Sequence, residues 1–291
     1  MPRTRTLVYR RVAECDIRAD VYEPDGEGRC PVVVWVHGGG LIRGGRDWIP
    51  EDFRDGCLRA GFVVVSVDYR LAPEAKLPEI MEDVQHAYQW VREVGPEAFA
   101  AEPDRVSVAG ASAGAHLALL AGYLVCPRPR SLVSFCGYGD IVGPWVSLPD
   151  AFYSQLPAVT AGEAYGLVGG EVLTYDMSDA RYPYYVYLRQ QGRWPHEAVG
   201  RDLEAEPEAF VRWCPVQNVD AAYPPTLLAH GTADQAVPYE QSVSMAEALE
   251  RAGVAHELIP VPGGGHGFDQ GWGADRERVV ERAVAFLREH L

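Results

Sequence analysis

Short apolar runs alternate along the chain with longer segments of helical periodicity, and this alternation constrains the fold more than any other feature. The runs PVVVWV at 31–36 and FVVVSV at 62–67 are apolar at nearly every position, which is typical of strands buried on both faces. Further strands are expected at 6–12, 16–23, 105–109, 132–136, 225–229 and 256–261, and helices at 47–60, 79–94, 113–125, 239–252 and 274–289. Strands that alternate with helices predict an α/β fold, with a mainly parallel central sheet, flanking helices and a leading antiparallel pair.

The interval 137–215 interrupts this rhythm. It holds 13 of the chain's 30 aromatic residues, and its prolines break the helical patterns into short pieces. We interpret it as a helical, aromatic-rich cap inserted between two strands of a core formed by 1–136 and 216–291. Its aromatic side chains are expected to divide between packing within the insertion and lining a substrate pocket. They include Tyr182, Tyr184, Tyr185, Tyr187, Trp194 and Trp213.

A serine stands between two glycines where one expected strand passes into the next helix. Residues 110–114 read GASAG, so Ser112 has Gly110 and Gly114 two positions away on either side. A nucleophilic serine on a tight strand-to-helix turn needs small flanking residues, because a Cβ there would collide with the neighbouring strand or helix. The pattern also arises by chance, so its context has to support it.

Serine is a poor nucleophile at neutral pH and needs a base within hydrogen-bond reach and an acid behind that base. His266, in VPGGGHGF at 261–268, follows the last expected strand, and its glycines allow the loop to approach the serine closely. Asp234, in HGTADQAVP at 230–238, follows the preceding strand and is suited to hold the other imidazole nitrogen. The chain order Ser112, Asp234, His266 is typical of a nucleophile elbow on such a sheet.

The sequence HGGG at 37–40 directly follows the apolar run that ends at 36. Ester hydrolysis passes through a tetrahedral oxyanion, which must meet preorganised N–H donors, and glycines allow the backbone to turn its amides toward that oxygen. We expect Gly38 and Gly39 to donate together with the amide of Ala113, and His37 to orient the loop. A phosphate-binding loop is disfavoured because neither the P-loop lysine nor the GxGxxG spacing is present.

Taken together, these motifs resemble those of the α/β-hydrolase superfamily, and within it the hormone-sensitive-lipase-like carboxylesterases. The resemblance rests on HGGG, DYRLAPE at 68–74, GASAG and the aspartate and histidine loops, which cover nearly the whole expected core. It implies a catalytic triad of Ser112, Asp234 and His266 and an oxyanion hole of Gly38, Gly39 and Ala113. It also implies that Asp68 and Arg70 of DYRLAPE brace loops beside the site. We expect no cofactor and no metal.

Two departures from the family pattern concern what the protein acts on. The residue before the serine is usually aspartate in this family and is Ala111 here, and the usual cap comes largely from the N-terminus rather than from 137–215. With His116 and the HGTADQAVP loop, these departures favour branches that contain feruloyl or acetyl esterases, formamidases and oligopeptidases. The expected substrates are carboxylic esters with small to moderately bulky acyl or aryl groups.

Other functions stay open as alternatives. An amidase, formamidase or peptidase would use the same triad, and the sequence separates these activities poorly from an esterase. A non-catalytic ligand receptor on this scaffold is expected to have lost a triad member, and all three are present. The unusual insertion keeps open a non-hydrolytic biosynthetic enzyme.

The net charge of −15 disfavours nucleic acid and anionic membranes as partners, since both need basic patches. There is no apolar run of about 18 residues, which predicts no membrane span, and the first residues lack the apolar region of a signal peptide. The six scattered cysteines are expected to be buried, reduced thiols of a cytoplasmic protein. The expected partner is a small-molecule ester. A homodimer stays open, although packing on the sheet explains the apolar stripe of the helix at 274–289.

Overall fold

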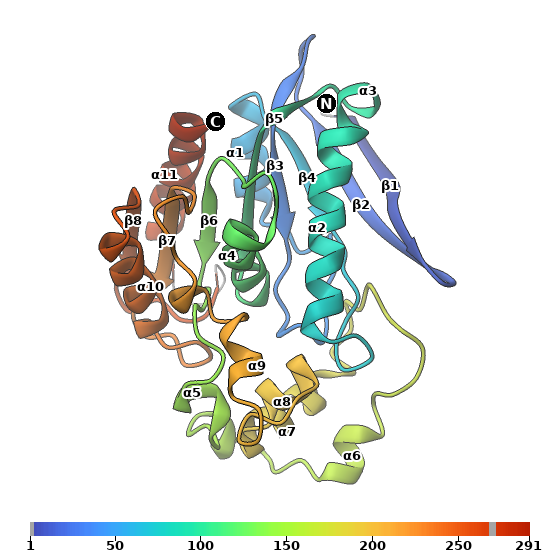
Figure 1. Ribbon diagram of the computed structural model, residues 1–291, viewed down its shortest axis with the longest axis vertical. Helices are drawn as coiled ribbons and strands as arrows, with labels where there is room; N and C mark the ends of the chain where they lie inside the picture. Colours follow the sequence, from blue (N-terminus) through green and yellow to red (C-terminus); the bar gives the residue numbers. More distant parts are fainter. Residues whose placement is uncertain (1–2, 268–271) are drawn as a thin grey trace.

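A computed structural model describes residues 3–267 and 272–291 of the chain (Figure 1). Within this part, eight strands form one sheet in the order β1-β2-β4-β3-β5-β6-β7-β8. Strand β2 pairs antiparallel with β1 and β4, whereas the other neighbouring pairs are parallel, which confirms the expected α/β architecture. The strands are β1 (Arg3–Val12), β2 (Cys15–Glu23), β3 (Cys30–Val36), β4 (Val63–Val67), β5 (Ala101–Ala111), β6 (Leu132–Phe135), β7 (Thr226–Gly231) and β8 (His256–Val261).

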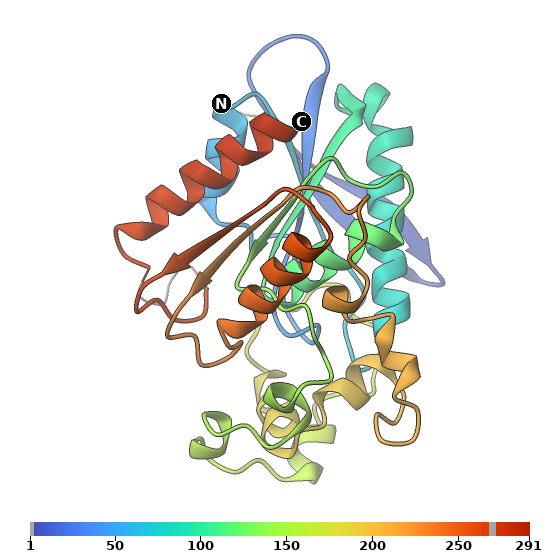
Figure 2. The same cartoon turned by 60° about the vertical axis from the view of Figure 1, so that its left-hand side comes forward.

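Both faces of the sheet are buried, which explains the continuous apolar runs. Successive side chains of a strand point to opposite faces, and along β3 Val34 packs into one hydrophobic cluster while Val33 and Trp35 pack into the other. The first cluster takes side chains from α2 (Leu77–Glu93), α4 (Ala113–Leu124) and α10 (Glu240–Arg251). The second takes them from α1 (Glu51–Arg59) and α11 (Asp275–His290). Figure 2 shows α11 and α10 on opposite sides of the sheet. The short α3 (Gly95–Ala98) precedes β5.

The stretch between β6 and β7, residues 136–225, is called here the β6–β7 segment and contains the interval expected to form a cap. Its helical pieces are short, as its prolines suggested. They are α5 (Pro144–Ser147), η1 (Tyr153–Gln155), α6 (Ala161–Tyr165), α7 (Tyr182–Gln191), α8 (Trp194–Val199), α9 (Glu208–Val211) and η2 (Pro215–Gln217). Helices α5 to α9 lie at one end of the molecule, beyond the sheet, in both views (Figures 1 and 2), and the residues after them return along α4, where the Tyr223 hydroxyl donates to the carbonyl of Leu119 at 2.6 Å.

The apolar stripe of α11 is covered within the chain. Its five members are buried in the second cluster: Val279, Val280, Ala283, Phe286 and Leu287. The stripe therefore needs no second copy of the chain to cover it. The six cysteines are free thiols, but the expectation that they are buried holds only for Cys57, Cys136 and Cys214, since Cys15 and Cys30 are half-buried and Cys126 is exposed. Among the helices of the described residues, none combines the length and the apolar character that crossing a membrane requires.

Candidate active site

Ser112 lies on a sharp turn between the end of β5 and the start of α4. Its backbone has φ 54° and ψ −121°, a conformation that non-glycine residues rarely adopt. A Cβ at Gly110 would lie 2.4 Å from the carbonyl oxygen of Gly114, and one at Gly114 would lie 2.1 Å from that of Val36. Both flanking positions therefore require glycine, and the turn presses directly against the end of β3.

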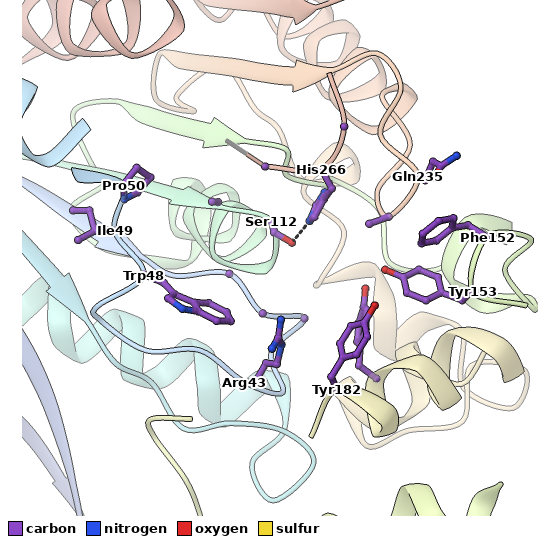
Figure 3. Close-up of a pocket in the computed structure, with 18 of the residues that line it drawn as sticks. Arg43, Trp48, Ile49, Pro50, Ser112, Phe152, Tyr153, Tyr182, Gln235 and His266 are labelled. Carbon is purple, nitrogen blue, oxygen red and sulfur yellow. Dashed lines mark hydrogen bonds between the residues drawn. The ribbon is translucent and has the colours of Figure 1, made fainter. Parts of the chain in front are cut away.

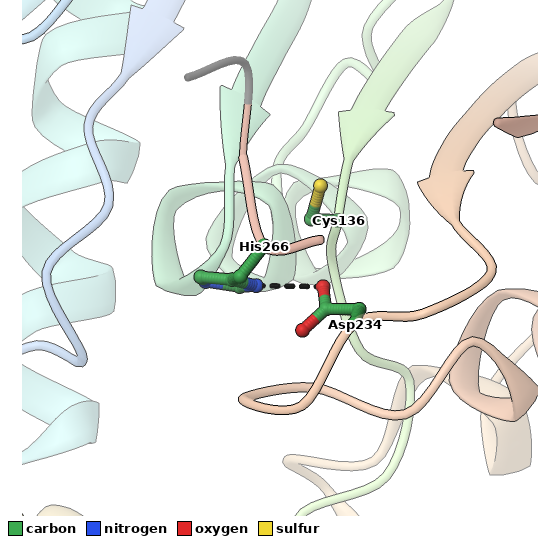
Figure 4. Close-up of side chains that lie close together, drawn as sticks. All are labelled: Cys136, Asp234 and His266. Atoms are coloured by element: carbon green, nitrogen blue, oxygen red, sulfur yellow. Dashed lines mark hydrogen bonds and ion pairs between the residues drawn. The ribbon is translucent and has the colours of Figure 1, made fainter. Parts of the chain in front are cut away.

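A continuous hydrogen-bonded chain connects the serine, the histidine and the aspartate named from the sequence. The Nε2 atom of His266 lies 2.9 Å from the Oγ of Ser112 (Figure 3). The Nδ1 atom of His266 lies 2.7 Å from the Oδ2 of Asp234 (Figure 4). Because a carboxylate only accepts, Nδ1 carries the proton, which leaves Nε2 of the neutral ring to accept from the serine hydroxyl. The arrangement suits proton transfer from serine to imidazole.

The carboxylate of Asp234 is buried and fully hydrogen-bonded. Its Oδ1 accepts the amides of Ala236 and Val237, both at 2.9 Å, and its Oδ2 accepts from a second imidazole, the Nε2 of His230 at 3.1 Å. Burial alone raises the pKa of Asp234, but the hydrogen bonds from His230 and His266 outweigh it and hold the pKa well below its usual range. Asp234 is thus ionised at neutral pH.

His230 is the site residue that the sequence analysis did not assign. It directly follows the strand expected at 225–229 and stands four positions before Asp234 in the motif HGTAD, so this close spacing was the available signal. The Nδ1 atom of His230 lies 2.7 Å from the Oγ of Ser242 on α10. Its ring is buried among the loop after β7 and α10 rather than exposed to the cavity.

Cys136 lies beside the histidine and the aspartate (Figure 4). The ligand atoms of Cys136, Asp234 and His266 lie within 4.8 Å of one another, a grouping that could in principle hold a metal ion. Burial raises the pKa of the Cys136 thiol to about 12, and its sulfur accepts the amide of Gly267 at 3.3 Å. A metal would need the thiolate, which this environment disfavours.

The glycine loop after β3 lies on the serine turn. A Cβ at Gly38 would lie 3.0 Å from the carbonyl oxygen of Ala111 and 3.2 Å from the Cβ of Ser112. Gly39 and Gly40 have φ values of 106° and 64°, a region that favours glycine. The loop expected to supply oxyanion donors is therefore in direct contact with the turn, and Ala113 is the first residue of α4.

His37 supports this loop from the protein interior. Its Nδ1–H donates to the carbonyl of Gly38 at 2.7 Å, and its ring stacks on Tyr69 with centroids 4.1 Å apart. The hydroxyl of Tyr69 donates to the carbonyl of His37 at 2.9 Å. Burial lowers the pKa of His37 to about 4, so the ring is neutral at pH 7. These contacts match the orienting role expected for His37.

The segment DYRLAPE braces neighbouring loops through ion pairs. The carboxylate of Asp68 accepts the amide of Arg46 at 2.8 Å and its Nη1 at 2.7 Å. The Nε of Arg70 donates to Asp83 of α2 at 2.8 Å. None of these four side chains lines the cavity described next, so the arrangement is consistent with the structural role that the resemblance implied.

A cavity of about 730 Å³ opens over the serine and the histidine (Figure 3). Its size suits a small-molecule ligand. The loops after β3 and β7 and the β6–β7 segment all contribute to its wall. The principal side chains are Arg43, Trp48, Ile49, Phe152, Tyr153, Tyr182, Tyr185 and Gln235. The aromatic residues of the insertion divide as expected, because Tyr182 and Tyr185 line the cavity while Tyr184, Trp194 and Trp213 are buried in the core.

Arg189 of α7 connects the β6–β7 segment to the loop that carries Asp234. It is 1% exposed, and its Nη1 donates to the carbonyl of Ala236 at 2.9 Å and to the hydroxyl of Tyr185 at 3.0 Å. Its Nη2 donates to the Oδ2 of Asp150 at 2.7 Å. Since the amide of Ala236 is itself a donor to Asp234, one arginine links the cavity wall and the buried carboxylate.

Comparisons with known proteins show the family to which the chain belongs. A family model described as alpha/beta hydrolase fold matches residues 33–270. The chain is 30% identical over 89% of its length to an esterase, LipC, and 32% identical over 95% of its length to a carboxylic ester hydrolase, LipN, both of Mycobacterium tuberculosis. The chain spans 58% of the length of LipC and 68% of that of LipN.

A solved structure shows the same fold over nearly the whole chain. An alpha/beta hydrolase superfamily protein from Enterococcus faecalis superposes with a TM-score of 0.78 and 23% sequence identity. The match covers 98% of each chain. It therefore includes the β6–β7 segment as well as the sheet.

Proposed function

Because the chain belongs to the alpha/beta hydrolase fold family, we propose that it is a serine hydrolase of carboxylic esters. The observation that carries this proposal is the hydrogen-bonded chain from Ser112 and His266, which line the cavity, to the buried carboxylate of Asp234. The similarity to LipC and LipN, both described as acting on esters, supports the reaction class.

We assign one or more residues to each step of the proposed reaction. Ser112 attacks the ester carbonyl while the Nε2 of His266 takes the hydroxyl proton. The amides of Gly38, Gly39 and Ala113 stabilise the oxyanion that forms. His266 then gives its proton to the departing alcohol, which leaves an acyl-enzyme, and water activated by the same imidazole releases the acid.

Asp234 acts in this proposal as the group that orients the histidine and stabilises its protonated form. The low pKa of Asp234 suits that role, since the carboxylate keeps its negative charge when the imidazole becomes positive. No step requires a cofactor or a metal.

Within the β6–β7 segment, residues 137–215 are proposed to act as the cap, with 1–136 and 216–291 as the hydrolase core. Aromatic side chains of the cap form one wall of the cavity, which favours small to moderately bulky acyl or aryl groups as the substrate. We further propose a cytoplasmic protein whose partner is a small-molecule ester.

The test compares hydrolysis of p-nitrophenyl esters of increasing acyl length and of an aryl amide by the wild type and by Ser112→Ala. In a related triad, loss of the nucleophile lowers kcat by about 10⁶-fold, so Ser112→Ala is expected to be inactive. Ser244→Ala, an exposed serine of α10, is the matched control and should retain full activity. Ester turnover that survives Ser112→Ala would refute the proposal, and preferential turnover of the amide would reassign it to an amidase.

A further inference from the structure

Arg43 is a cavity cation whose hydrogen-bonding capacity is largely unused. Its Nη1 pairs with Asp179, and no other residue of the described ranges accepts from its guanidinium. Arg276, which also lines the cavity, instead forms a two-point contact with Asp52, with Nε and Nη2 at 2.6 and 3.0 Å from the two carboxylate oxygens. Arg43 thus retains donors that can face a ligand.

The guanidinium of Arg43 is held in place by two aromatic rings. Its Cζ lies 5.0 Å from the ring centroid of Trp48 and 5.3 Å from that of Tyr182, and all three side chains line the cavity (Figure 3). The backbone of Arg43 is fixed as well, because its amide donates to the carbonyl of Gly39 at 3.2 Å. A planar fork positioned in advance loses little freedom when it binds.

The existing partner of Arg43 is easily replaced. The side chain of Asp179 is 86% exposed, whereas that of Arg43 is 21% exposed. An ion pair with such an exposed carboxylate contributes little to stability. A ligand carboxylate inside the cavity would meet the same guanidinium with less water around it, and an arginine binds a carboxylate through two parallel hydrogen bonds.

The negative net charge of the protein strengthens the argument that Arg43 binds an anion. The chain carries a net charge of −15, which disfavours an anionic ligand unless a local cation binds it. A carboxylate does line the cavity, that of Asp47, and it accepts the hydroxyl of Tyr175. An apolar ester would gain nothing from a positive charge on the wall, whereas an acidic ester would.

We propose that Arg43 forms an anion subsite and that the ester substrate carries a carboxylate remote from the bond that is cleaved. This inference rests on the proposed ester hydrolysis for its substrate class, but the subsite itself is a statement about binding. Its ligands are monoesters of dicarboxylic acids or esters of hydroxy acids, with the free acid seated between Trp48 and Tyr182.

The kinetic test uses two acidic esters, each with a neutral counterpart of similar shape. Mono-p-nitrophenyl glutarate is compared with p-nitrophenyl valerate, and 4-acetoxybenzoate with 4-acetoxybenzamide, so that the acid lies on the acyl or on the alcohol side. For at least one pair, Arg43→Gln is expected to lower the acidic-to-neutral ratio of kcat/KM by about 10-fold or more, the effect of losing a hydrogen bond to a charged group. The loss should appear mainly in KM.

Three variants sharpen this result. Arg43→Lys keeps the charge but loses the fork, so its ratio should fall between those of the wild type and Arg43→Gln. Asp179→Asn removes the competing carboxylate and should raise the ratio. Arg201→Gln, an exposed arginine outside the cavity wall, is the matched control and should leave the ratio unchanged. An equal ratio in the wild type and Arg43→Gln for both pairs would overturn the subsite.

A binding measurement separates this proposal from the proposed function. Glutarate and 4-hydroxybenzoate are titrated calorimetrically into Ser112→Ala and into Ser112→Ala with Arg43→Gln. Tighter binding to the protein that keeps Arg43, by about 10-fold for either acid, is expected whether or not esters are cleaved. Equal binding or no binding of both acids would refute the anion subsite, while absent or serine-independent ester turnover would refute only the hydrolase proposal.

Discussion

The Nε2 of His230 lies 3.1 Å from the Oδ2 of Asp234, the same oxygen that the ring of His266 approaches to 2.7 Å. The Nε2 of His230 also lies 3.0 Å from the carbonyl of Val237, which only accepts, so this nitrogen carries a proton. Its Nδ1 then accepts from the hydroxyl of Ser242. Two imidazoles therefore donate to one buried carboxylate oxygen.

Replacement of His230 by phenylalanine should weaken catalysis without touching the cavity. A hydrogen bond to a charged group contributes about 1.5–3 kcal/mol, so His230→Phe is expected to lower kcat/KM by about 10- to 100-fold. A carboxylate with one donor fewer attracts the protonated ring of His266 more strongly, and only the neutral ring can accept the serine proton, so the acid limb of the pH–rate profile should move to higher pH. Steady-state rates measured across the acid range check both effects.

The control for His230 is Ser242→Ala, which removes the contact at the other ring nitrogen and leaves the donor to Asp234 in place. It should change the pH profile less than His230→Phe does. A variant His230→Phe with reduced activity but an unchanged acid limb would mean that His230 only fills space.

A methyl group at Gly38 should weaken stabilisation of the transition state more than it lowers the folding stability of the protein. Its Cβ would lie 3.0 Å from the carbonyl oxygen of Ala111, so the loop must shift and displace the expected oxyanion amides. Loss of one such donor lowers kcat by about 10²- to 10³-fold, and Gly38→Ala should approach that range with little change in KM. Gly162→Ala, where the added Cβ meets nothing within 4 Å, should behave as wild type. Wild-type kcat in Gly38→Ala would remove Gly38 from the oxyanion hole.

Arg189→Met should loosen the β6–β7 segment and the loop of Asp234 together. Removal of one partner from a buried ion pair costs about 3–5 kcal/mol, here because Asp150 and the carbonyl of Ala236 lose their donor. Urea unfolding should show that loss, and limited proteolysis should cut the segment sooner than in the wild type. Arg193→Met, on the same segment without these contacts, is the comparison, and an equal loss in both variants would contradict the special role of Arg189.

Acid should destabilise the protein through its buried histidines. Burial lowers the pKa of His116 from 6.5 to about 4, and its Nδ1–H donates to the carbonyl of Tyr138 at 2.9 Å. The unfolded chain therefore binds a proton first as the pH falls, so the stability that is complete above pH 6.5 is lost progressively toward pH 4, by about 3 kcal/mol for this group. His116→Gln, which keeps a donor but does not titrate, should lose about 2–3 kcal/mol less between pH 7 and pH 4.5 in urea unfolding. His86→Gln, at an exposed position, is the control and should lose as much stability between these pH values as the wild type. An equal loss in His116→Gln and the wild type would mean that His116 does not contribute to the acid sensitivity.

The sequence predicted the order of strands and helices because burial on both faces leaves a continuous apolar run, as in β3. The apolar periodicity misplaced some element boundaries. This happened where a loop continues the apolar pattern of a helix, or where polar residues interrupt the apolar pattern of a strand. The helix expected from 47 begins at Glu51, since residues 47–50 turn to line the cavity. The strand expected at 105–109 extends over Ala101–Ala111, because the charged residues near its start conceal it.

Some residues of the candidate site could be grouped from the sequence, whereas other contacts of the site could not. Ser112, Asp234 and His266 follow strands whose ends meet at one edge of a parallel sheet, so motif and order were enough to group them, and their catalytic roles stay predictions. The contacts of Arg43 and of His230 depend on loops and helices from distant parts of the chain. No local pattern encodes the exposure of Asp179 or the distance from an imidazole to a carboxylate.

The contact between Gly114 and the carbonyl of Val36 has a consequence for how this protein can change. The proposed nucleophile follows β5 and the proposed oxyanion loop follows β3, and this contact holds the two together. Their relative position is therefore kept as long as the sheet stays folded. The packing of the core therefore fixes the position of the proposed reacting groups. The choice of substrate depends instead on side chains of the cavity wall, such as Tyr182, that are not part of the core. Substitutions in the β6–β7 segment can therefore change which substrates bind while the rate at which a bound ester reacts is kept.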